Sequence, residues 1–337
     1  MNSDKTTYII FGASGDLSKR YLLPALKNME QEVNIVTISR KDYDHLKDLI
    51  ETNQKSASAD GEKIFHLAIP PEGIPDAIKI ISDNFGNSNL KIMLEKPFGE
   101  DLKSAQHLVE YVDRYFSEDQ IYRVDHYLVK ESLKNLVGQN ENIKSVEITA
   151  SEELGIEGRV NFYEQTGALR DFVQSHLLEM AAVTLAGSFE RKKREEVLKN
   201  LSIVCDIIKN ECVKRGQYEG YRDEVGNPAS MTETFVSVNL AAGDISIILT
   251  TGKALKEKST RIKIKYRDGS EKTFHIEREP DAYEKVFSAA IEGKKDLFIS
   301  QKEVLQSWRI LEDIQDTWRS RGGDLIIYPR GGSIEEI

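Results

Sequence analysis

The sequence has few of the features that define membrane, secreted or nucleic-acid-binding proteins. It contains no apolar run long enough to span a bilayer, and its first residues, MNSDKTT, carry no signal-peptide pattern. Basic residues do not predominate: 46 Lys and Arg stand against 56 Asp and Glu, which makes the formal net charge −10. Because a phosphate backbone requires a basic face, this balance argues against a nucleic-acid binder. These absences predict a cytoplasmic protein that binds neither membranes nor nucleic acids.

Cysteine is also scarce, with only Cys205 and Cys212 in the chain. Both fall in a segment with helical character, residues 195–215, where their spacing puts them roughly 10 Å apart along the axis. That distance is too long for a disulfide, and no second Cys/His pair stands nearby to complete a zinc site. The sequence therefore predicts free thiols in a reducing compartment and no metal site.

The first third of the chain alternates strands and helices. A length of 337 residues exceeds what one hydrophobic core usually supports, so we expect two domains. Alternation of this kind indicates βαβ units, and strands that are apolar throughout indicate a parallel sheet covered on both faces. The predicted strands are 7–11, 33–39, 63–68 and 91–95, and the predicted helices are 22–29, 43–52, 74–85 and 102–116.

After Arg123 the strands lose their crossover helices, which predicts an α+β domain with a mainly antiparallel sheet. The segment RDGSE, residues 267–271, is typical of a hairpin turn. KKREE, residues 192–196, predicts a solvated helix face. We expect a Rossmann-like α/β domain over residues 1–128 and the α+β domain over residues 129–337. The later predicted helices are 131–136, 168–185, 195–215, 283–291 and 302–318, and the later predicted strands are 233–241, 244–249, 260–266 and 272–276.

A glycine-containing turn follows the first predicted strand. It provides two of the three glycines of the dinucleotide fingerprint, Gly12 and Gly15, and the helix after it directs backbone N–H groups at an anion. Ser14 adds a hydroxyl, and Asp16 and Leu17 complete the predicted cofactor contacts. Taken alone the turn is weak evidence, because a glycine turn between strand and helix also occurs in α/β proteins that bind nothing.

The end of the second strand distinguishes the two nicotinamide cofactors. An NAD site usually has Asp or Glu there to bind the ribose hydroxyl, whereas this strand is followed by Arg40 and Lys41. Basic side chains at that point suit the 2′-phosphate of NADP, with NAD as the alternative. A pair of solvated charges would be the default interpretation, and only the preceding glycine turn favours NADP over it.

Polar residues at the predicted domain junction indicate a ligand site. Asp125 and His126 follow the short strand IYRV, where ligand crevices commonly form. Lys130 lies four residues after His126, so both side chains share a face if a helix starts there, and such a pair suits a phosphate. His176 lies in an apolar-periodic helix, where a lone histidine is more often a core residue than a catalyst. Asp171 would ordinarily be a surface or first-turn residue.

Nine segments of the sequence, taken in order, carry a family resemblance: FGASGDLSKRYLLPAL, LEKPFGEDLKSA, IYRVDHYLVKESLKNL, EELGIEGR, GALRDFVQSHLLEM, TETFVSVNL, TTGKALKEKSTRIKIKY, DAYEKVFSAAIEGKKDLF and the tail LIIYPRGGSIEE. Together they resemble the glucose-6-phosphate dehydrogenase family almost from end to end. The segments RVDHYLVKE and ALRDFVQSH are the most specific, since their ionisable residues all have roles in that family.

The resemblance implies a role for each site residue. His176 would be the general base at the sugar C1 hydroxyl, and Asp125 would orient its ring. Hydride would pass from C1 of a sugar phosphate to NADP⁺, as in the pentose phosphate pathway, without a metal. The family also implies a homodimer. The resemblance implies that the 6-phosphate is bound by His126, Tyr127 and Lys130. Lys96 would lie between the sugar and the nicotinamide. Sugar hydroxyls would be bound by Glu152 and Asp171, and Lys253 would approach the sugar from the second domain.

The chain departs from the family's pattern at several positions. It is shorter, with one shortening between Thr52 and Lys63 and a second after Tyr266. Tyr21 stands where a lysine is usual, Val129 where a glycine is usual, and Ser175 where an asparagine is usual. Two alternatives stay open: a dehydrogenase of a related sugar phosphate, such as an amino sugar, and a non-catalytic sensor of NADPH or sugar phosphate. A sensor has no use for a pair such as His176 and Asp125, which argues against it.

Overall fold

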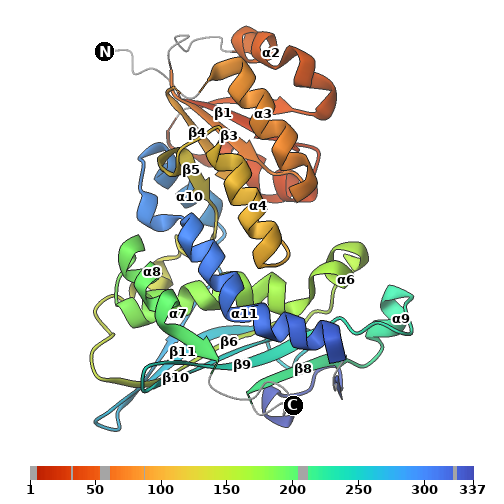
Figure 1. Ribbon diagram of the computed structural model, residues 1–337, viewed down its shortest axis with the longest axis vertical. Helices are drawn as coiled ribbons and strands as arrows, with labels where there is room; N and C mark the ends of the chain where they lie inside the picture. Colours follow the sequence, from red (N-terminus) through yellow and green to blue (C-terminus); the bar gives the residue numbers. More distant parts are fainter. Residues whose placement is uncertain (1–5, 32, 54–60, 87, 204–211, 322–324) are drawn as a thin grey trace. The chain divides into compact units, whose positions relative to one another are not determined.

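The computed structural model describes residues 6–31, 33–53, 61–86, 88–203, 212–321 and 325–337. These residues divide into two compact units (Figure 1). Unit 1 comprises the described residues up to Gly99 together with 103–129 and 279–301. Unit 2 comprises the described residues of 100–102, 130–278 and 302–337. Residues 279–301, which the sequence placed in the second domain, therefore pack in unit 1.

Unit 1 is built on a parallel sheet of five strands among the described residues, in the order β2-β1-β3-β4-β5. All residues of β1 are buried, and β3 and β4 are buried along most of their length. Such strands need cover on both faces of the sheet. The predicted Rossmann-like α/β fold is confirmed. The strands are β1 (Thr7–Phe11), β2 (Asn34–Ile38), β3 (Lys63–Leu67), β4 (Leu90–Leu94) and β5 (Ile121–Arg123).

Helices connect these strands where the apolar periodicity predicted them. The helix α3 shows why its ends fall where they do: Pro75 lies in its first turn, and Gly86, with φ of 64°, ends it. Its observed span is the predicted one, residues 74–85. The helices of the alternating region are α1 (Leu23–Asn28), α2 (Leu46–Asn53), α3 (Ile74–Phe85) and α4 (Leu102–Asp113). Three of them are directly preceded by a short helical segment: the π-helical η1 (Ser18–Leu22) and the 3-10 helices η2 (Arg40–His45) and η3 (Pro71–Gly73).

A helix from late in the sequence, α10 (Ala282–Ile291), completes the core of unit 1. Its Phe287 packs in the same cluster as Tyr8 and Met93. Lys91 on β4 donates hydrogen bonds from Nζ to the carbonyl oxygens of Ala290 (2.8 Å) and Ile291 (2.9 Å). A lysine at the carboxyl end of a helix satisfies free carbonyls and complements the helix dipole. This anchoring explains why residues 279–301 belong with unit 1.

Unit 2 contains a mixed sheet of eight strands, counted over the described residues. The strands pair in the order β12-β11-β6-β10-β9-β8-β13, and β7 pairs with β9. Two pairs, β6 with β10 and β8 with β13, are parallel, and the other pairs are antiparallel. The mainly antiparallel sheet is therefore confirmed. The strands are β6 (Ile143–Ser151), β7 (Leu201–Ile203), β8 (Val213–Tyr218), β9 (Phe235–Ala242), β10 (Ile245–Gly252), β11 (Ser259–Tyr266), β12 (Glu271–His275) and β13 (Ile326–Tyr328).

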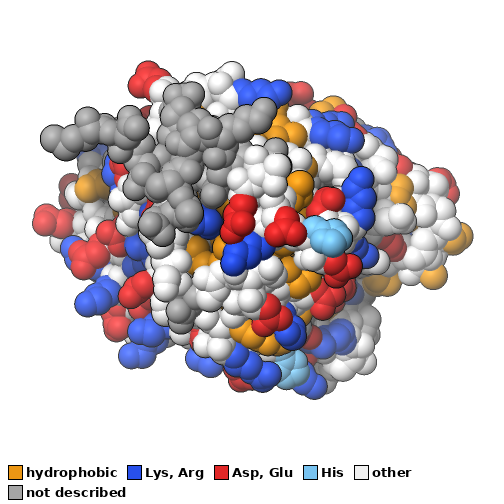
Figure 2. Space-filling view, turned by 90° about the horizontal axis from the view of Figure 1, so that it is seen from above, with side chains coloured by type: hydrophobic (Ala, Val, Ile, Leu, Met, Phe, Trp, Pro, Cys, Tyr) orange, Lys and Arg blue, Asp and Glu red, His pale blue; other side chains and the backbone are white. Residues whose placement is uncertain are grey.

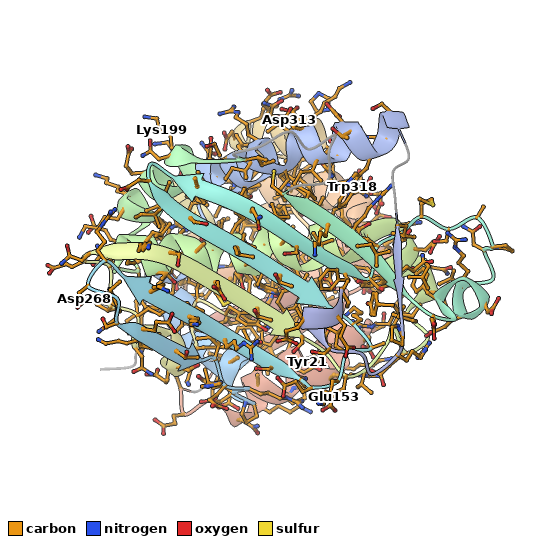
Figure 3. All side chains as sticks on the ribbon, turned by 90° about the horizontal axis from the view of Figure 1, so that it is seen from below. Tyr21, Glu153, Lys199, Asp268, Asp313 and Trp318 are labelled. Carbon is orange, nitrogen blue, oxygen red and sulfur yellow. The ribbon has the colours of Figure 1, made fainter. Side chains whose placement is uncertain are left out.

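One face of this sheet is drawn toward the viewer in Figure 3, with no helix over most of its strands. Side chains alternate across the sheet, so that Val146 and Ile148 on β6 are buried while Glu147 between them is exposed. Glu147 lies opposite Lys263 on β11, and Lys263 forms an ion pair with Glu271 at 2.8 Å. The uncovered face is therefore polar.

The helices of unit 2 include a continuous run from η5 into α7, which follows α6 after a break at Gly167. Every residue of α7 from Leu178 to Thr184 is buried. No helix among the described residues is both long enough and apolar enough to cross a membrane. The helices are α5 (Glu131–Lys134), α6 (Val160–Ala168), η5 (Leu169–Leu177), α7 (Leu178–Ala186), α8 (Arg191–Asn200), α9 (Tyr221–Val225) and α11 (Gln301–Arg321).

The predicted helix over residues 195–215 is wrong. The helix α8 ends at Asn200, and the strands β7 and β8 follow, both paired with β9. Pairing with β9 outweighs the local helical pattern there. The prediction of free thiols fails for the same reason, because Cys212 is disulfide-bonded. Helical spacing does not apply to this segment, and the second cysteine, Cys205, lies outside the described residues.

The predicted solvated face of residues 192–196 is wrong at one position. Lys192, Lys193 and Glu196 are exposed, but Arg194 is 0% exposed. Its guanidinium is paired with Glu303 on α11 and lies 3.5 Å from Glu179 on α7. A buried carboxylate needs such a partner, and the charge pattern of a single helix does not reveal it.

Charged side chains elsewhere form local pairs at the surface. Figure 2 shows acidic and basic side chains interspersed over the face that it draws. Arg20 pairs with Asp16 at 2.7 Å, and Lys79 pairs with Asp83 at 2.5 Å, each four residues apart. Exposed pairs of this kind contribute about 1 kcal/mol or less to the free energy of unfolding. The stability of the fold therefore rests on its apolar cores.

Candidate active site

The predicted cofactor turn is held firmly at its base. Gly12 has φ of 83°, and a Cβ at this position would overlap the carbonyl oxygen of Ala68, just after β3, so only glycine fits. Its backbone N–H donates to the carbonyl of Ile38 at the end of β2 (3.2 Å), and its carbonyl accepts from Ser18 Oγ (3.0 Å). The turn is therefore fixed to the carboxyl ends of β1, β2 and β3, where ligands of open α/β sheets bind.

The tip of the turn is open. Ser14, Gly15 and Asp16 are exposed, and Leu17 is half-buried. The N–H of Gly15 donates to the carbonyl of Gly12 at 3.0 Å, which folds the tip tightly. Because Gly15 carries no side chain, a phosphate can approach the backbone there. These residues fit the diphosphate of a nicotinamide dinucleotide.

The cationic pair at the end of β2 lies beside this turn. Phe11 on β1 is in register with Ile38 on β2, so Arg40 and Lys41 leave the same edge of the sheet as the glycine turn. Both side chains are exposed. The nearby Asp42 turns back, and its Oδ2 accepts from the backbone N–H (2.8 Å) and Oγ (2.5 Å) of Ser39. These bonds to Ser39 lower the pKa of the Asp42 carboxyl. Asp42 therefore caps its own turn instead of extending from the strand end.

The loop after β5 carries three of the predicted site residues of unit 1, Asp125, His126 and Tyr127. Asp125 is 1% exposed, and its Oδ1 accepts a hydrogen bond from the backbone N–H of Tyr127 at 2.9 Å. The rings of His126 and Tyr127 lie 5.0 Å apart. A side-chain bond to the backbone two residues on is an Asx-type turn, which fixes the carboxylate.

No helix starts at His126, which was the condition for a face shared with Lys130. Residues 126–129 are turns, and α5 begins only at Glu131, because the Asp125 bond gives the backbone an alternative to a helix. The condition for a helix face shared by His126 and Lys130 is therefore not met. Lys130, in unit 2, is 6% exposed and donates from Nζ to the carbonyl of Glu277 at 3.0 Å.

Lys96 follows the end of β4 and is half-buried. The residue before it, Glu95, contacts His66 and Tyr283. The sequence did not single out any of these three side chains as functional. His66 Nε2 lies 2.8 Å from Glu95 Oε1, and the Tyr283 hydroxyl donates to Glu95 Oε2 at 3.3 Å. Two signals were available: a histidine within the apolar strand KIFHLA, and a carboxylate directly before the predicted functional lysine.

In unit 2, His176 lies on the π-helical segment η5. In a π-helix each N–H bonds the carbonyl five residues back, so residues five apart share a face. Asp171 and His176 are five apart, which the α-helical period would place on different faces. Ser175 Oγ donates to the carbonyl of Asp171 (3.0 Å), and the ring of Phe172 packs edge-on to His176 at 4.9 Å. His176 is 4% exposed.

Glu152 and Lys253 are brought together by the one parallel pair in the middle of the sheet. β6 and β10 are in register, with Ser151 opposite Gly252, and each predicted site residue is the next one along its strand. The Glu152 N–H donates to the carbonyl of Gly252 at 2.9 Å, and Lys253 Nζ forms an ion pair with Glu152 Oε2. Lys253 is 4% exposed, so this pair is shielded from solvent on the lysine side.

Two further side chains of unit 2 lie beside these residues. Lys253 Nζ lies 5.2 Å from the centre of the Tyr163 ring, a cation–π contact. The Tyr163 hydroxyl is buried, with no hydrogen-bond partner within the described part of the chain. Burial, followed by the charge of Asp171, raises the pKa of Tyr163 well above its usual value. Tyr163 thus places a desolvated hydroxyl among residues predicted to bind sugar. The sequence provides no signal for this role beyond the presence of a tyrosine in the segment NFYEQ.

Glu233 is the other unpredicted carboxylate. Its Oε1 accepts from the backbone N–H of Leu169 at 2.9 Å, and its carboxylate occupies the space where Gly167 would carry a side chain. Gly167 breaks the helix between α6 and η5 with φ of 65°. Glu233 and Arg170 both line a cavity of about 340 Å³. The carboxylate therefore supports the start of the segment that carries His176.

Glu233→Gln is expected to stabilise the protein at high pH. Burial raises the pKa of Glu233 above the ordinary value of 4.5. The folded state therefore holds this proton more tightly than the unfolded chain, so the stability it provides is present at low pH and declines as the pH rises through the folded pKa. Glutamine keeps the acceptor for Leu169 but does not ionise.

Thermal unfolding of the wild type and Glu233→Gln between pH 4 and pH 8 measures this effect. The melting temperature of the variant relative to the wild type should increase with pH. A difference that is constant across the range would contradict the assignment. The exposed Glu219 provides a control, because Glu219→Gln should leave the pH dependence unchanged.

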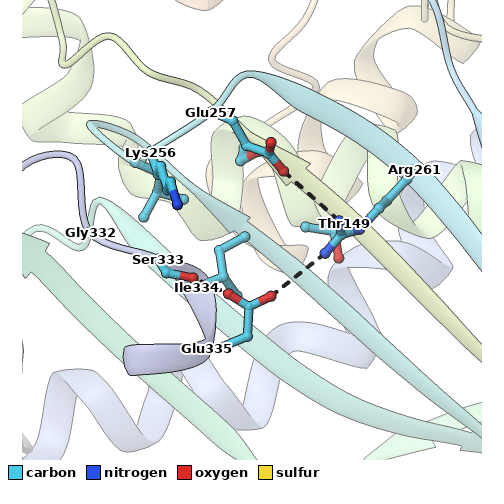
Figure 4. Close-up of a pocket in the computed structure, with 10 residues that line it drawn as sticks. Thr149, Lys256, Glu257, Arg261, Gly332, Ser333, Ile334 and Glu335 are labelled. Carbon is cyan, nitrogen blue, oxygen red and sulfur yellow. Dashed lines mark hydrogen bonds and ion pairs between the residues drawn. The ribbon is translucent and has the colours of Figure 1, made fainter.

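A separate hollow of about 200 Å³ lies on unit 2 (Figure 4). Arg261 stands 3.9 Å from each of two carboxylates, Glu257 and Glu335, as the dashed lines mark. Lys256 adds a further cation at its rim. Its described lining contains no residue of the predicted substrate or cofactor site.

Unit 1 has a parallel sheet of the dinucleotide-binding type, with a glycine turn after β1. Unit 2 has a mixed sheet, a buried histidine and a lysine paired with a glutamate. Together these features define a class of proteins, the two-domain nicotinamide-dependent oxidoreductases. Comparison with protein families narrows the class. The family described as "Glucose-6-phosphate dehydrogenase, NAD binding domain" matches residues 33–135. The family described as "Glucose-6-phosphate dehydrogenase, C-terminal domain" matches residues 131–279 and 270–334. The chain belongs to the glucose-6-phosphate dehydrogenase family.

Curated relatives agree with this assignment. The chain is 27% identical to the glucose-6-phosphate 1-dehydrogenase of Bacillus subtilis, over 93% of this chain and 92% of the relative. It is 35% identical to glucose-6-phosphate 1-dehydrogenase 5, cytoplasmic, of Arabidopsis thaliana, over 65% of this chain and 47% of the relative. The protein is therefore an enzyme of the glucose-6-phosphate dehydrogenase type that uses a nicotinamide dinucleotide.

Solved structures show the same fold. A glucose-6-phosphate dehydrogenase in complex with its substrate glucose-6-phosphate superposes with a TM-score of 0.83 at 24% identity, covering 98% of this chain and 95% of that chain. A putative myo-inositol dehydrogenase from Sinorhizobium meliloti superposes with a TM-score of 0.63 at 14% identity, covering 94% of this chain and 98% of that chain. At these identities the likeness concerns the fold alone.

Proposed function

We propose that the protein oxidises glucose 6-phosphate at C1 with NADP⁺ and releases a 6-phosphoglucono-lactone. His176 accepts the proton of the C1 hydroxyl as general base, while the hydride leaves C1. The oxidised nicotinamide, when bound, supplies the hydride acceptor. Asp125 holds the second imidazole nitrogen and stabilises the imidazolium that forms. Family membership together with the π-helical segment that carries His176 is the observation that supports this proposal most.

The substrate would be held at both ends. His126, Tyr127 and Lys130 bind the 6-phosphate, and the hydrogen bond from Lys130 to the Glu277 carbonyl is exchanged for one to the phosphate. Glu152 and Asp171 accept hydrogen bonds from sugar hydroxyls. Lys253 balances the charge of Glu152, and Lys96 lies between sugar and nicotinamide. In this proposal residues 1–128 form the nucleotide-binding domain, which also contributes Lys96, His126 and Tyr127 to the sugar phosphate, and residues 129–337 form the substrate domain.

An assay of nicotinamide reduction separates the proposed function from its alternatives. Purified protein is mixed with NADP⁺ and glucose 6-phosphate, and absorbance of the reduced nicotinamide is followed. Reduction supports the proposal. Reduction only with another sugar phosphate, such as glucosamine 6-phosphate, would replace the substrate. Tight binding of glucose 6-phosphate without turnover, measured by calorimetry, would indicate a sensor.

The preference for NADP over NAD is part of the proposal. It is supported by Arg40 and Lys41 at the end of β2, and by the Asp42 carboxylate being engaged by Ser39. Arg40→Ala is expected to raise KM for NADP⁺ about tenfold and KM for NAD⁺ less than twofold, because only NADP⁺ carries the 2′-phosphate. Initial rates at varied cofactor concentration measure both constants. Equal increases would remove the argument. Arg114→Ala, at an exposed arginine of unit 1 outside the predicted site, serves as the control.

A homodimer in the cytoplasm is also proposed. The sheet face drawn toward the viewer in Figure 3 offers a second copy a surface of paired polar side chains. Sedimentation velocity gives the mass in solution, and a monomer at all concentrations would exclude the dimer. The cytoplasmic location is supported by the Arabidopsis thaliana relative, which is a cytoplasmic enzyme by name.

A further inference from the structure

A chain of polar contacts in unit 1 ends on His126. It begins at His66 on β3, passes through Glu95 at the end of β4, and reaches Tyr283 on α10. None of these three residues belongs to the predicted site. Their sequence separation is large, so only the parallel pairing of β3 with β4 and the packing of α10 bring them together.

Glu95 is a buried carboxylate with both oxygens engaged. It is 9% exposed, and an ionisable group so removed from water requires hydrogen-bond partners. His66 Nε2 serves Oε1 at 2.8 Å, and the Tyr283 hydroxyl donates to Oε2 at 3.3 Å. Glu95 is therefore an anchor that holds the hydroxyl end of Tyr283.

His66 is itself fixed by its surroundings. It is 0% exposed and lies between two aromatic rings, Phe287 at 5.8 Å and Tyr8 at 6.4 Å. Its Nδ1 has no hydrogen-bond partner among the described residues, so the tautomer protonated at Nε2 suits the contact with Glu95. The orientation of this ring is set by the core of unit 1.

The ring of Tyr283 stacks on His126. Their centres are 6.2 Å apart with an interplanar angle of 21°. Tyr21 and Phe287 contact Tyr283 at 6.2 and 6.0 Å, so the tyrosine ring is held from several sides. Burial and then the charge of Glu95 raise the pKa of Tyr283 well above its usual value, which keeps its hydroxyl protonated as a donor. His126, in contrast, lies in a loop of turns without a helix to orient it.

We propose that Tyr283, anchored by Glu95 and His66, is a positioning residue that sets the plane of the His126 ring. The orientation of that ring then determines how strongly the enzyme prefers a phosphorylated sugar over the unphosphorylated one. This inference rests on the proposed function in one respect, the role of His126 in binding the 6-phosphate. A ring held in one plane loses less conformational entropy when it binds a phosphate oxygen.

Two variants of Tyr283 test the proposal. Tyr283→Phe keeps the ring but loses the hydrogen bond to Glu95, and Tyr283→Leu loses the stacking as well. Tyr115→Leu is the matched control, because Tyr115 is a half-buried tyrosine of unit 1 whose ring contacts Tyr111 instead of His126. The ratio of kcat/KM for glucose 6-phosphate to that for glucose is expected to fall about tenfold in Tyr283→Leu and about threefold in Tyr283→Phe. The control should leave the ratio unchanged.

The ratio distinguishes positioning from stability, since a general loss of folded enzyme lowers both constants together. An unchanged ratio in Tyr283→Leu would overturn the proposal. Independently of turnover, the ring signals of His126 in a ¹H–¹³C spectrum of histidine-labelled protein should shift in Tyr283→Leu, with His126→Asn identifying them. Signals that do not move would also overturn it.

If the wild type oxidises neither glucose 6-phosphate nor glucose, the proposed function is wrong, but the positioning of His126 can still be tested. The positioning of His126 is then decided by calorimetry with inorganic phosphate. Weaker phosphate binding in Tyr283→Leu than in the wild type and Tyr115→Leu supports it, and equal binding, or no phosphate binding by the wild type, overturns it.

Discussion

Replacement of His176 by asparagine is expected to lower the turnover of glucose 6-phosphate by about two to four powers of ten, because the reaction loses the proposed general base. Asparagine keeps a neutral side chain that forms hydrogen bonds, so the affinity for the sugar phosphate should change little. Stopped-flow or steady-state assays give kcat, and calorimetry with the sugar phosphate gives the dissociation constant. The separation of the two quantities identifies a base.

His107→Asn is the matched control for this experiment. His107 is exposed on α4 and belongs to no predicted site, so its replacement should leave turnover within a factor of about two. Equal and small effects of both substitutions would show that His176 is not the base. A large loss of affinity in His176→Asn without a change in kcat would instead assign it to substrate binding.

Arg194→Met is expected to destabilise the protein by about 3–5 kcal/mol, because it leaves buried carboxylates without their cation. Arg194 Nε lies 2.7 Å from Glu303 Oε1 and 3.5 Å from Glu179 Oε2, and all three side chains are at most 1% exposed. Urea unfolding followed by circular dichroism measures the change in the free energy of unfolding. Because Glu179 is three residues after His176, the same cluster also supports the segment that carries His176.

Two further variants make this prediction specific. Lys193→Met changes the neighbouring residue, whose side chain is 57% exposed and pairs with Glu190, and should cost less than about 1 kcal/mol. The double variant Arg194→Met with Glu303→Leu removes one unpaired carboxylate and should recover part of the loss. A cost for Arg194→Met as small as that of Lys193→Met would mean that the buried carboxylates find other partners.

The alternating region shows how far periodicity alone reaches. Residues 74–85 were predicted as a helix and form α3, since Pro75 and Gly86 mark its ends and its apolar positions follow the helical period. The same holds for β1 and β3, whose continuous apolar runs require a sheet buried on both faces. In these segments local propensity and tertiary packing favour the same structure.

Long-range pairing explains where sequence patterns failed. Residues after Asn200 carry a helical pattern, but β7 and β8 form because β9 provides their hydrogen-bond partners. The strand β6 was missed, although Glu152 directly follows it and its parallel pairing with β10 brings Glu152 to Lys253. No local signal reports which strand will be a neighbour, because register depends on residues about a hundred positions away.

The sequence by itself determined the class of the two sheets, the glycine turn with its cationic neighbours, and the residue types of the candidate site. These follow from local chemistry: periodicity, turn residues, and strings of ionisable residues that resemble one family. Only the tertiary structure decided that Arg194 is buried, that Asp171 and His176 share a π-helical face, and that His66, Glu95 and Tyr283 meet. Burial and contact depend on which distant segments pack together. The free energy of that packing depends on several segments at once, so the sequence of any one segment does not predict it.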